Sequence, residues 1–423
     1  MAILTSLFAG VSGLNAFGTG LSVISNNIAN LNTTGFKDSR VSFADLVSSG
    51  SSRAQVGRGV LVNDIRTNFD QGSFEPTGSE LDLAVEGEGF FVLRDAAGAE
   101  FYTRNGSFNV SKNGLVENSE GLLLQGRQAT ITGSVTGQPT GNIDLSTTNS
   151  TPAPTANIAV DANLDSRAVT PGAFNLATPS ATSNFSTSIT IYDALGNGNL
   201  VNVYFTKSST ANQWDYNAVV SAADSSTGSA VVAGTGTLVF GTNGTLTSVS
   251  SVSGTFNFSG GATLNQAVTF DFGSPTGSGG TGLDGLTQFG SSSAVLTQTQ
   301  DGFAAGSLSS VSIDKNGIVT GLFTNGQSRS LAQVRLARFN NDQGLSKVGD
   351  NAYVLSNDSG QPILGDPNSG GMGRVLSNSL ELSNVDLAQQ FIKMIEYQRG
   401  FQANSRSITT TDELLQELVN LIR

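Results

Sequence analysis

Cysteine and histidine are both absent from this chain of 423 residues. Without thiols or imidazoles, the chain has no means of forming disulfides, Cys or His metal sites, thiol nucleophiles or any triad that uses an imidazole. The sequence also contains no Walker loop and no nucleophile elbow. We therefore predict a protein that is not an enzyme, with no catalytic residue, no metal site and no cofactor.

Charged residues are scarce as well. Asp, Glu, Lys and Arg make up 13% of the chain, about half of the usual share, and the net charge is −12. A negative balance argues against nucleic acid or an anionic membrane as a partner. No uninterrupted apolar run reaches the roughly 18 residues of a membrane span, and the N-terminus lacks the pattern of a secretory signal peptide. The hydrophobic share of 38% is still enough to build packed cores.

Three short motifs could suggest ligand sites. GSGGTG at 277–282 matches G-x-G-x-x-G by letter, but no helix pattern follows, and we interpret it as a linker. DKNG at 314–317 resembles the start of a calcium loop without its glutamate at the twelfth position, and a hairpin turn fits better. Glu86 and Glu88 share one face of a predicted strand, where a solvated surface is favoured over a cation site.

The first 36 side chains contain no ionisable group, and Lys37 is the first charged one. Apolar residues recur there every three or four positions, which predicts an amphipathic helix over 1–30. The other face carries Ser, Thr, Gly and Asn. The candidate interface residues on this helix are Leu7, Val11, Leu14, Phe17, Leu21, Ile24 and Ile28.

A second helix is predicted over 383–423, with an apolar residue at every seventh position and charges on its other faces. In the sequence SNVD, Ser383 or Asn384 would cap this helix, with Asp386 in the first turn. The candidate interface residues here are Leu387, Phe391, Met394, Phe401, Ile408, Leu415 and Ile422.

Between the helices the apolar period changes to two, and Gly- and Asn-containing turns separate the segments. This predicts an α+β multidomain fold with two mainly antiparallel β domains, the outer one inserted into the inner one. The expected borders are 31–72 for a connector with a flexible Gly/Ser segment at 48–59, 73–148 and 292–382 for the inner domain, and 149–291 for the outer domain.

The terminal helices have two interpretations. They could be core helices of an ordinary domain, or an intramolecular helix pair. However, a pair covers only one stripe of each helix, and the uncharged first helix then needs a further neighbour. We therefore favour packing between copies in a polymer. Asn26, Asn27 and Asn30 would then act partly as helix caps and partly as amide partners between subunits, and Gly35 would permit the left-handed turn that follows.

Segments at both ends of the chain resemble those of a known protein family. SNNIANLNTTGFK (25–37), with its turn residues Thr34, Gly35 and Phe36, and NVDLAQQFIKMIEYQRGFQANSRSITTTDELLQELVNLIR (384–423) resemble the terminal signatures of the bacterial flagellar rod and hook axial proteins. DLAVEGEGFFVL (82–93) and ARFNNDQGLSKVGDNAYVLS (337–356) are similar to blocks of its middle domain. The large middle insertion favours the hook members over the shorter rod members.

The resemblance implies a curved helical tube that transmits torque from rod to filament as a universal joint and encloses an export channel. Its inner, coiled-coil-like layer would be formed by the terminal helices. It also implies a homopolymer that meets distal rod, hook cap and hook–filament junction proteins. Export would use the flagellar type III apparatus without a cleavable signal peptide, which places the chain outside the cell. The alternatives are a distal rod protein and a cell-surface β-repeat adhesin.

Overall fold

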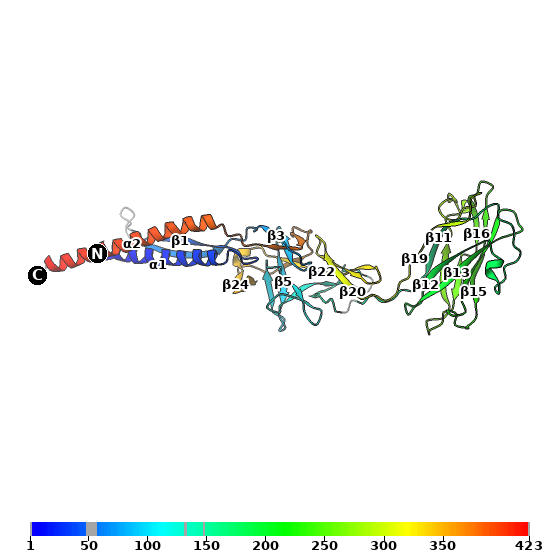
Figure 1. The fold of residues 1–423 in the computed structure, drawn as a ribbon. Helices are drawn as coiled ribbons and strands as arrows, with labels where there is room; N and C mark the ends of the chain where they lie inside the picture. The colour runs from blue at the N-terminus through cyan, green and yellow to red at the C-terminus, as the bar shows by residue number, and fades with distance from the viewer. Residues whose placement is uncertain (1, 48–56, 131–132, 147–148, 422–423) are drawn as a thin grey trace. The chain divides into compact units, whose positions relative to one another are not determined.

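The computed structural model describes residues 2–47, 57–130, 133–146 and 149–421. Two long helices, α1 (Ala2–Ala29) and α2 (Leu387–Leu421), lie toward the two ends of the chain, and the segments between them are mainly strands and turns (Figure 1). The prediction of two terminal helices with a β-rich, largely antiparallel middle is confirmed at this level.

The start of α2 corrects the predicted cap. Asp386 caps the helix, because its Oδ1 accepts hydrogen bonds from the backbone N–H groups of Ala388 (2.9 Å) and Gln389 (3.1 Å). Asn384 instead uses its Oδ1 to accept the backbone N–H of Asp38 at 2.8 Å. The helix therefore begins at Leu387, four residues later than predicted.

The chain divides into two compact units. Unit 1 comprises Met1–Thr148, Ser309–Leu322 and Ser328–Arg423, and unit 2 comprises Asn149–Leu308 and Phe323–Gln327. Unit 1 therefore contains both helices together with a β region of its own, and unit 2 is built from strands and turns with short 3₁₀ helices at Pro179–Ala181 and Thr276–Ser278.

Unit 1 holds a two-stranded ribbon, a thirteen-stranded sheet and two short strand pairs, β27–β4 and β28–β3. Its aromatic core includes Phe90, Tyr102, Phe339 and Tyr353. A short 3₁₀ helix spans Asp342–Gly344. The strands are β1 (Ser39–Val47), β2 (Gly57–Thr67), β3 (Phe74–Pro76), β4 (Leu83–Glu86), β5 (Phe90–Arg94), β6 (Glu100–Thr103), β7 (Asn109–Val110), β8 (Val116–Glu117), β9 (Leu123–Gln128), β10 (Thr140–Asn142), β20 (Leu308–Ile313), β21 (Ile318–Phe323), β22 (Ser328–Val334), β23 (Leu336–Arg338), β24 (Ser346–Gly349), β25 (Ala352–Val354), β26 (Ile363–Gly365), β27 (Arg374–Ser377) and β28 (Ser379–Glu381).

The segment 31–72, expected to be a connector, contains the antiparallel ribbon β1–β2, and both strands pack against α1. The ring of Phe43 on β1 lies 5.9 Å from the ring of Phe17 on α1. Of the stretch 48–59 that we predicted to be flexible, residues 48–56 lie outside the described part of the chain, and 57–59 form the start of β2.

Unit 2 is a sandwich of two sheets around one apolar core. The five-stranded sheet runs β12-β13-β14-β15-β16 and the four-stranded sheet runs β17-β18-β11-β19, in which β11 and β18 are parallel. Trp214 and Tyr216 are fully buried between them. The strands are β11 (Asn157–Asn163), β12 (Phe185–Tyr192), β13 (Gly198–Lys207), β14 (Gln213–Val220), β15 (Val231–Phe240), β16 (Leu246–Ser250), β17 (Ser253–Phe256), β18 (Gln266–Asp271) and β19 (Ala294–Gln300). The last of these lies beyond the expected border at 291.

By length and mean hydropathy alone, the stretch Thr5–Ala29 of α1 could cross a membrane, which the search for uninterrupted apolar runs did not predict. Gly, Ser and Asn interrupt this stretch, and 28% of the most apolar window is buried within the chain. The same helix packs on α2 and on the β1–β2 ribbon. A helix that is apolar around much of its circumference is also what burial inside a larger protein assembly requires.

Candidate assembly surfaces and the junction that holds them

Glycine forms the contact between α1 and α2, which run antiparallel. A Cβ atom on Gly13 would lie 2.7 Å from Oδ1 of Asn404, and one on Gly20 would lie 2.6 Å from the ring of Tyr397. Both distances are too short for an alanine unless these side chains or the helices shift. The contact between α1 and α2 therefore includes glycines that sequence reasoning passed over, beside Phe17 of the predicted stripe, whose ring lies 5.8 Å from that of Tyr397.

The predicted stripe on α1 is only partly covered within the chain. Ile24 is buried, and Val11 is exposed. Phe17 packs against Phe43 and Tyr397, with ring centroids 5.9 and 5.8 Å apart. The remaining predicted stripe residues are half-buried, and these are Leu7, Leu14, Leu21 and Ile28. Their role as contacts between copies stays a prediction.

The predicted stripe on α2 is more open still. Among its described residues none is fully buried: Leu387, Phe391 and Phe401 are exposed, and Met394, Ile408 and Leu415 are half-buried. Ile422 lies outside the described residues. Two further apolar side chains of α2 lie outside the predicted set of interface residues. Ile392 is 66% exposed and Ile395 is 52% exposed. This helix therefore carries an apolar face that its own chain does not cover.

The asparagine cluster at the end of α1 acts mainly within the chain. The buried Asn27 donates from Nδ2 to the backbone oxygen of Ser39 (2.8 Å) and to Oε1 of Gln390 (3.3 Å), and its Oδ1 accepts the Ser39 N–H at 3.0 Å. It thereby joins α1, β1 and α2. Asn30 donates to the backbone oxygen of Asn26 at 2.9 Å and closes the last turn. Only the side chain of Asn26 is exposed, so the predicted amide contact between copies rests on that residue.

The turn Thr34-Gly35-Phe36 docks the end of α1 onto the β region. Gly35 has φ +68°, and a Cβ there would lie 2.5 Å from the backbone nitrogen of Asn105, so only glycine fits. Its N–H donates to the backbone oxygen of Glu381 at 2.7 Å. Phe36 is buried, and Thr34 accepts a hydrogen bond from the side chain of Asn351 at 2.8 Å. The turn is therefore a structural joint within the chain.

A buried ionic cluster follows directly after this turn. The side chains of Lys37 and Glu381 are both 0% exposed, with Nζ and Oε1 2.6 Å apart, and Nζ also donates to the backbone oxygen of Asp70 at 2.7 Å. Glu381 accepts the N–H of Gly72 at 2.9 Å and lies 3.5 Å from Arg104. Burial lowers the pKa values of Lys37 and Arg104, and the Glu381 carboxylate opposes both shifts.

Sequence reasoning noted Lys37 as the first charge but gave it no role. Its partner Glu381 lies 344 positions away, and no local pattern links the two. The sequence carries no signal for the pair, because a lysine at this position is equally compatible with exposure to water, and only its burial demands a partner. The cluster fixes the chain leaving α1 to β28, the strand that leads into α2.

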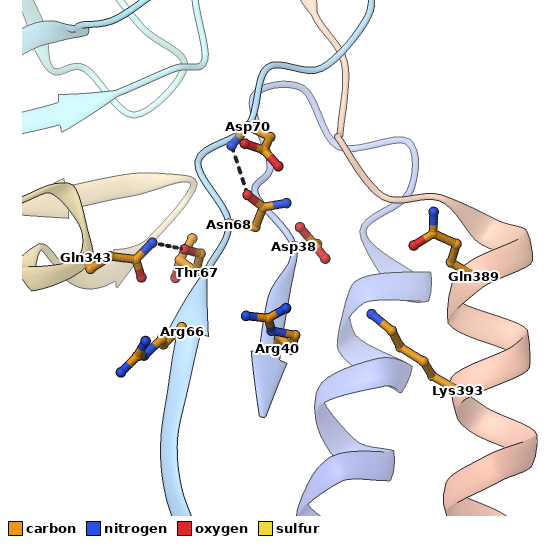
Figure 2. Close-up of a pocket in the computed structure, with 9 residues that line it drawn as sticks. All are labelled: Asp38, Arg40, Arg66, Thr67, Asn68, Asp70, Gln343, Gln389 and Lys393. Carbon is orange, nitrogen blue, oxygen red and sulfur yellow. Dashed lines mark hydrogen bonds between the residues drawn. The ribbon is translucent and has the colours of Figure 1, made fainter. Parts of the chain in front are cut away.

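A polar hollow of about 450 Å³ lies beside this junction, between the β1–β2 ribbon and the start of α2 (Figure 2). Its lining residues are Asp38, Arg40, Arg66, Thr67, Asn68, Asp70, Gln343, Gln389 and Lys393. Figure 2 shows Arg66, Arg40 and Lys393 in a row along one side, with Asp38, Asn68 and Asp70 above them. Sequence reasoning did not identify this hollow, because its lining comes from four separate segments.

In the structure, the carboxylates of two of the three motifs that could have held ligands make contacts within the chain. Glu86 pairs with Arg374 at 2.7 Å, and Glu88 lies 3.4 Å from Arg338. Oδ1 of Asp314 accepts the N–H groups of the following turn, between β20 and β21. In the described part of the chain, no three His, Cys, Asp or Glu side chains gather in a way that could hold a metal ion.

Four family models match successive parts of the chain. They are "Flagella basal body rod protein" at 7–37, "Flagellar hook protein FlgE/F/G D1 domain" at 84–171, "Flagellar basal body protein FlaE D2 domain" at 163–303 and "Flagellar basal body rod FlgEFG protein C-terminal" at 376–421. All four descriptions name one class of protein, that of the flagellar rod and hook.

Full-length relatives narrow this class. The flagellar hook protein FlgE of Borreliella burgdorferi is 36% identical, with 99% of this chain and 100% of the relative covered. That of Salmonella typhimurium is 36% identical, with 97% and 98% covered. The crystal structure of Helicobacter pylori flagellar hook protein FlgE2 matches at 15% identity with a TM-score of 0.49, over 71% of this chain and 98% of that one. The chain belongs to the flagellar hook protein family.

Proposed function

We propose that the protein is the structural subunit of the flagellar hook and that its copies assemble through α1 and α2 into a curved helical tube. The tube would transmit torque from rod to filament as a universal joint and enclose the export channel. The observation that carries this proposal is the apolar face of α2 that the single chain leaves uncovered.

The exposed face of α2 is too apolar for a helix that stays in water. Phe391, Ile392 and Ile395 are 47%, 66% and 52% exposed, and Phe8 on α1 is 66% exposed. Full burial of one such side chain contributes about 1.5–3 kcal/mol, so covering the exposed part of each supplies roughly 1 kcal/mol. Several such contacts per copy, repeated along a tube, would hold a polymer together, and large exposed apolar patches mark this kind of surface.

The charge distribution suggests how the helices are layered. α1 carries no charged side chain, whereas α2 carries charges along its whole length. We infer that α1 lies between neighbouring copies in the tube wall, that α2 turns its charged side to the channel water and its apolar face to neighbouring copies, and that the two form a coiled-coil-like inner layer. A Cβ on Gly18 of α1 would meet no atom of its own chain within 4 Å, which leaves room for the close approach of a neighbouring copy. A head-to-tail contact between copies generates an open helix when its rotation does not close into a ring, which is the geometry that the proposed tube requires.

Membership of the hook protein family supports the proposed partners and location. Besides other copies of itself, it would meet the distal rod, the hook cap, the hook–filament junction proteins and the type III export apparatus. It would act outside the cell, as a structural protein and not as an enzyme. The unit 2 sandwich, inserted between parts of unit 1 in the sequence, would form the outer domain.

Electron microscopy of the purified full chain under polymerising salt conditions, beside a variant that lacks residues 1–30, tests the proposal. We expect curved tubes from the full chain and none from the variant. A second comparison uses Phe391→Ser with Ile395→Ser on α2, and the matched control Val169→Ser with Leu296→Ser, two exposed apolar residues of unit 2.

The α2 pair should abolish tubes and the unit 2 pair should not. Straight tubes would instead indicate a distal rod protein. Monomers in every sample, with protease-resistant helices, would overturn the polymer and favour a self-contained surface protein.

A further inference from the structure

Two cations beside the polar hollow make no ion pair with the described residues of the chain. Arg66 is paired with Asp64 at 3.0 Å, but within the described residues the side chains of Arg40 and Lys393 make no ion pair. Figure 2 shows Arg40 on β1 and Lys393 on α2 at a similar level of the hollow, both below Asp38 and Asp70 in this view. Asp38 and Asp70 line the other end of the hollow. The hollow therefore has an anionic end and a cationic end, and Arg40 and Lys393 belong to the cationic one.

The opposite end of α2 has the complementary charge. Between Leu387 and Thr411 the helix carries three basic residues and one acidic residue. From Asp412 to Leu421 it carries three acidic residues and no basic one, and the acidic side chains of Asp412, Glu413 and Glu417 are all exposed. The helix is therefore basic toward the hollow and acidic toward its far end.

These two regions cannot meet within one molecule. Lys393 and Asp412 are separated by 19 positions along one helix, which at 1.5 Å per residue is about 28 Å. The acidic end can reach such a hollow only on another copy. From these observations, and on the basis of the proposed polymer, we infer that the hollow of one copy receives the acidic segment 412–417 of a second copy.

The apolar stripes alone would leave the arrangement of copies undecided. The α2 stripe repeats every seven residues, so a slip of one heptad, about 10.5 Å along the helix, places equivalent side chains in contact again. Charges at two defined positions remove that degeneracy, because carboxylates meet Arg40 and Lys393 at one register only. Arginine binds carboxylates through two parallel hydrogen bonds, which adds geometric selectivity. The charge pairs thus set the register of neighbouring copies, offset by about 30 Å along α2.

Charge reversal on each side, alone and combined, tests this contact. The variants are Arg40→Glu with Lys393→Glu, Asp412→Lys with Glu413→Lys, and all four together. We expect each pair to raise the concentration needed for polymerisation at least about fivefold, and the combination to restore it to within about twofold of the unmodified chain, as charge complementarity across an interface requires. The control Lys112→Glu with Lys315→Glu reverses two exposed lysines elsewhere in unit 1 and should have no effect.

A chemical cross-link reports the contact independently of these variants. Because the chain contains no cysteine, copies with Lys393→Cys can be mixed with copies with Glu413→Cys and treated with a short bis-maleimide. Dimers should form in the mixed polymer and in neither sample alone.

The inference is overturned if the unmodified chain polymerises but the mixed polymer yields no cross-linked dimer, or if the combined reversal is no better than either pair. No polymer from the unmodified chain would overturn the proposed function itself.

Discussion

Replacing Glu381 by Gln tests whether the buried ionic cluster holds the helices to the β region. The substitution keeps the side-chain volume but removes the one carboxylate that faces both Lys37 and Arg104. Removing one member of a buried ion pair costs about 3–5 kcal/mol, because the remaining charge stays uncompensated. The amide oxygen of Gln can still accept the N–H of Gly72, so we expect the lower end, about 3 kcal/mol.

The two units offer separate signals for this measurement. The chain has a single tryptophan, Trp214, which is fully buried in the unit 2 sandwich, so its fluorescence reports the unfolding of unit 2. Both long helices belong to unit 1, so helical circular dichroism reports that unit. In urea, below the concentration for assembly, Glu381→Gln should move the dichroism transition to lower urea and leave the fluorescence transition in place.

Glu86→Gln is the matched control. Glu86 pairs with Arg374 at 2.7 Å, nearly the distance between Lys37 and Glu381, but these side chains are 38% and 50% exposed. Water and salt screen such a pair, and its loss should leave both transitions unchanged. If Glu381→Gln behaves like Glu86→Gln, the cluster does not hold the junction. If the fluorescence transition moves as well, the stabilisation is not local to unit 1.

Three further predictions concern single positions. Burial raises the pKa of Tyr216 to about 12. The protonated hydroxyl therefore contributes stability to unit 2 that is fully present below about pH 10 and lost as the pH rises through 12. Tyr216→Phe should flatten that loss in fluorescence-monitored unfolding. Gly20→Ala would place a Cβ 2.6 Å from Tyr397 and should lower the free energy of unfolding measured by dichroism. Gly18→Ala, with open space around it, should raise that free energy by up to about 1 kcal/mol. The same Gly18→Ala variant should hinder assembly in a sedimentation assay. Asp386→Ala should cost about 1 kcal/mol in the same dichroism transition, and no loss would contradict its role as the cap.

The sequence predicted both helices well because a long period of three and four residues is a local signal. Their ends were less certain. SNVD offers three capping side chains within four positions, and propensity alone does not choose among Ser383, Asn384 and Asp386. The choice is made by a distant contact: Asn384 bonds to Asp38 and also to Asn68, which removes it from the helix end and leaves Asp386 as the cap.

Contacts between distant segments were beyond local patterns. Asn27 was proposed in part as a contact between copies, but its amide is used by Ser39 and Gln390 of the same chain. The ribbon β1–β2 was expected as a connector, because the Gly/Ser-rich sequence at 48–59 suggested a flexible linker and not two paired strands that pack on α1. The β domains were recognised from their alternation and turns, whereas the pairing of β11 with both β18 and β19 depends on tertiary packing.

The disagreement over the helix faces itself bears on function. Within the chain, α1 and α2 meet through Gly13 and Gly20, residues that a search for apolar periodicity passes over. The more regular pattern, an apolar residue at every seventh position of α2, leads to Leu387 and Phe401, which remain exposed. A sequence consistent with its own fold alone would have no reason to keep such regularity on a solvent-facing surface. A regular stripe that the fold covers only in part is what the proposed contact with further copies of the same helix requires.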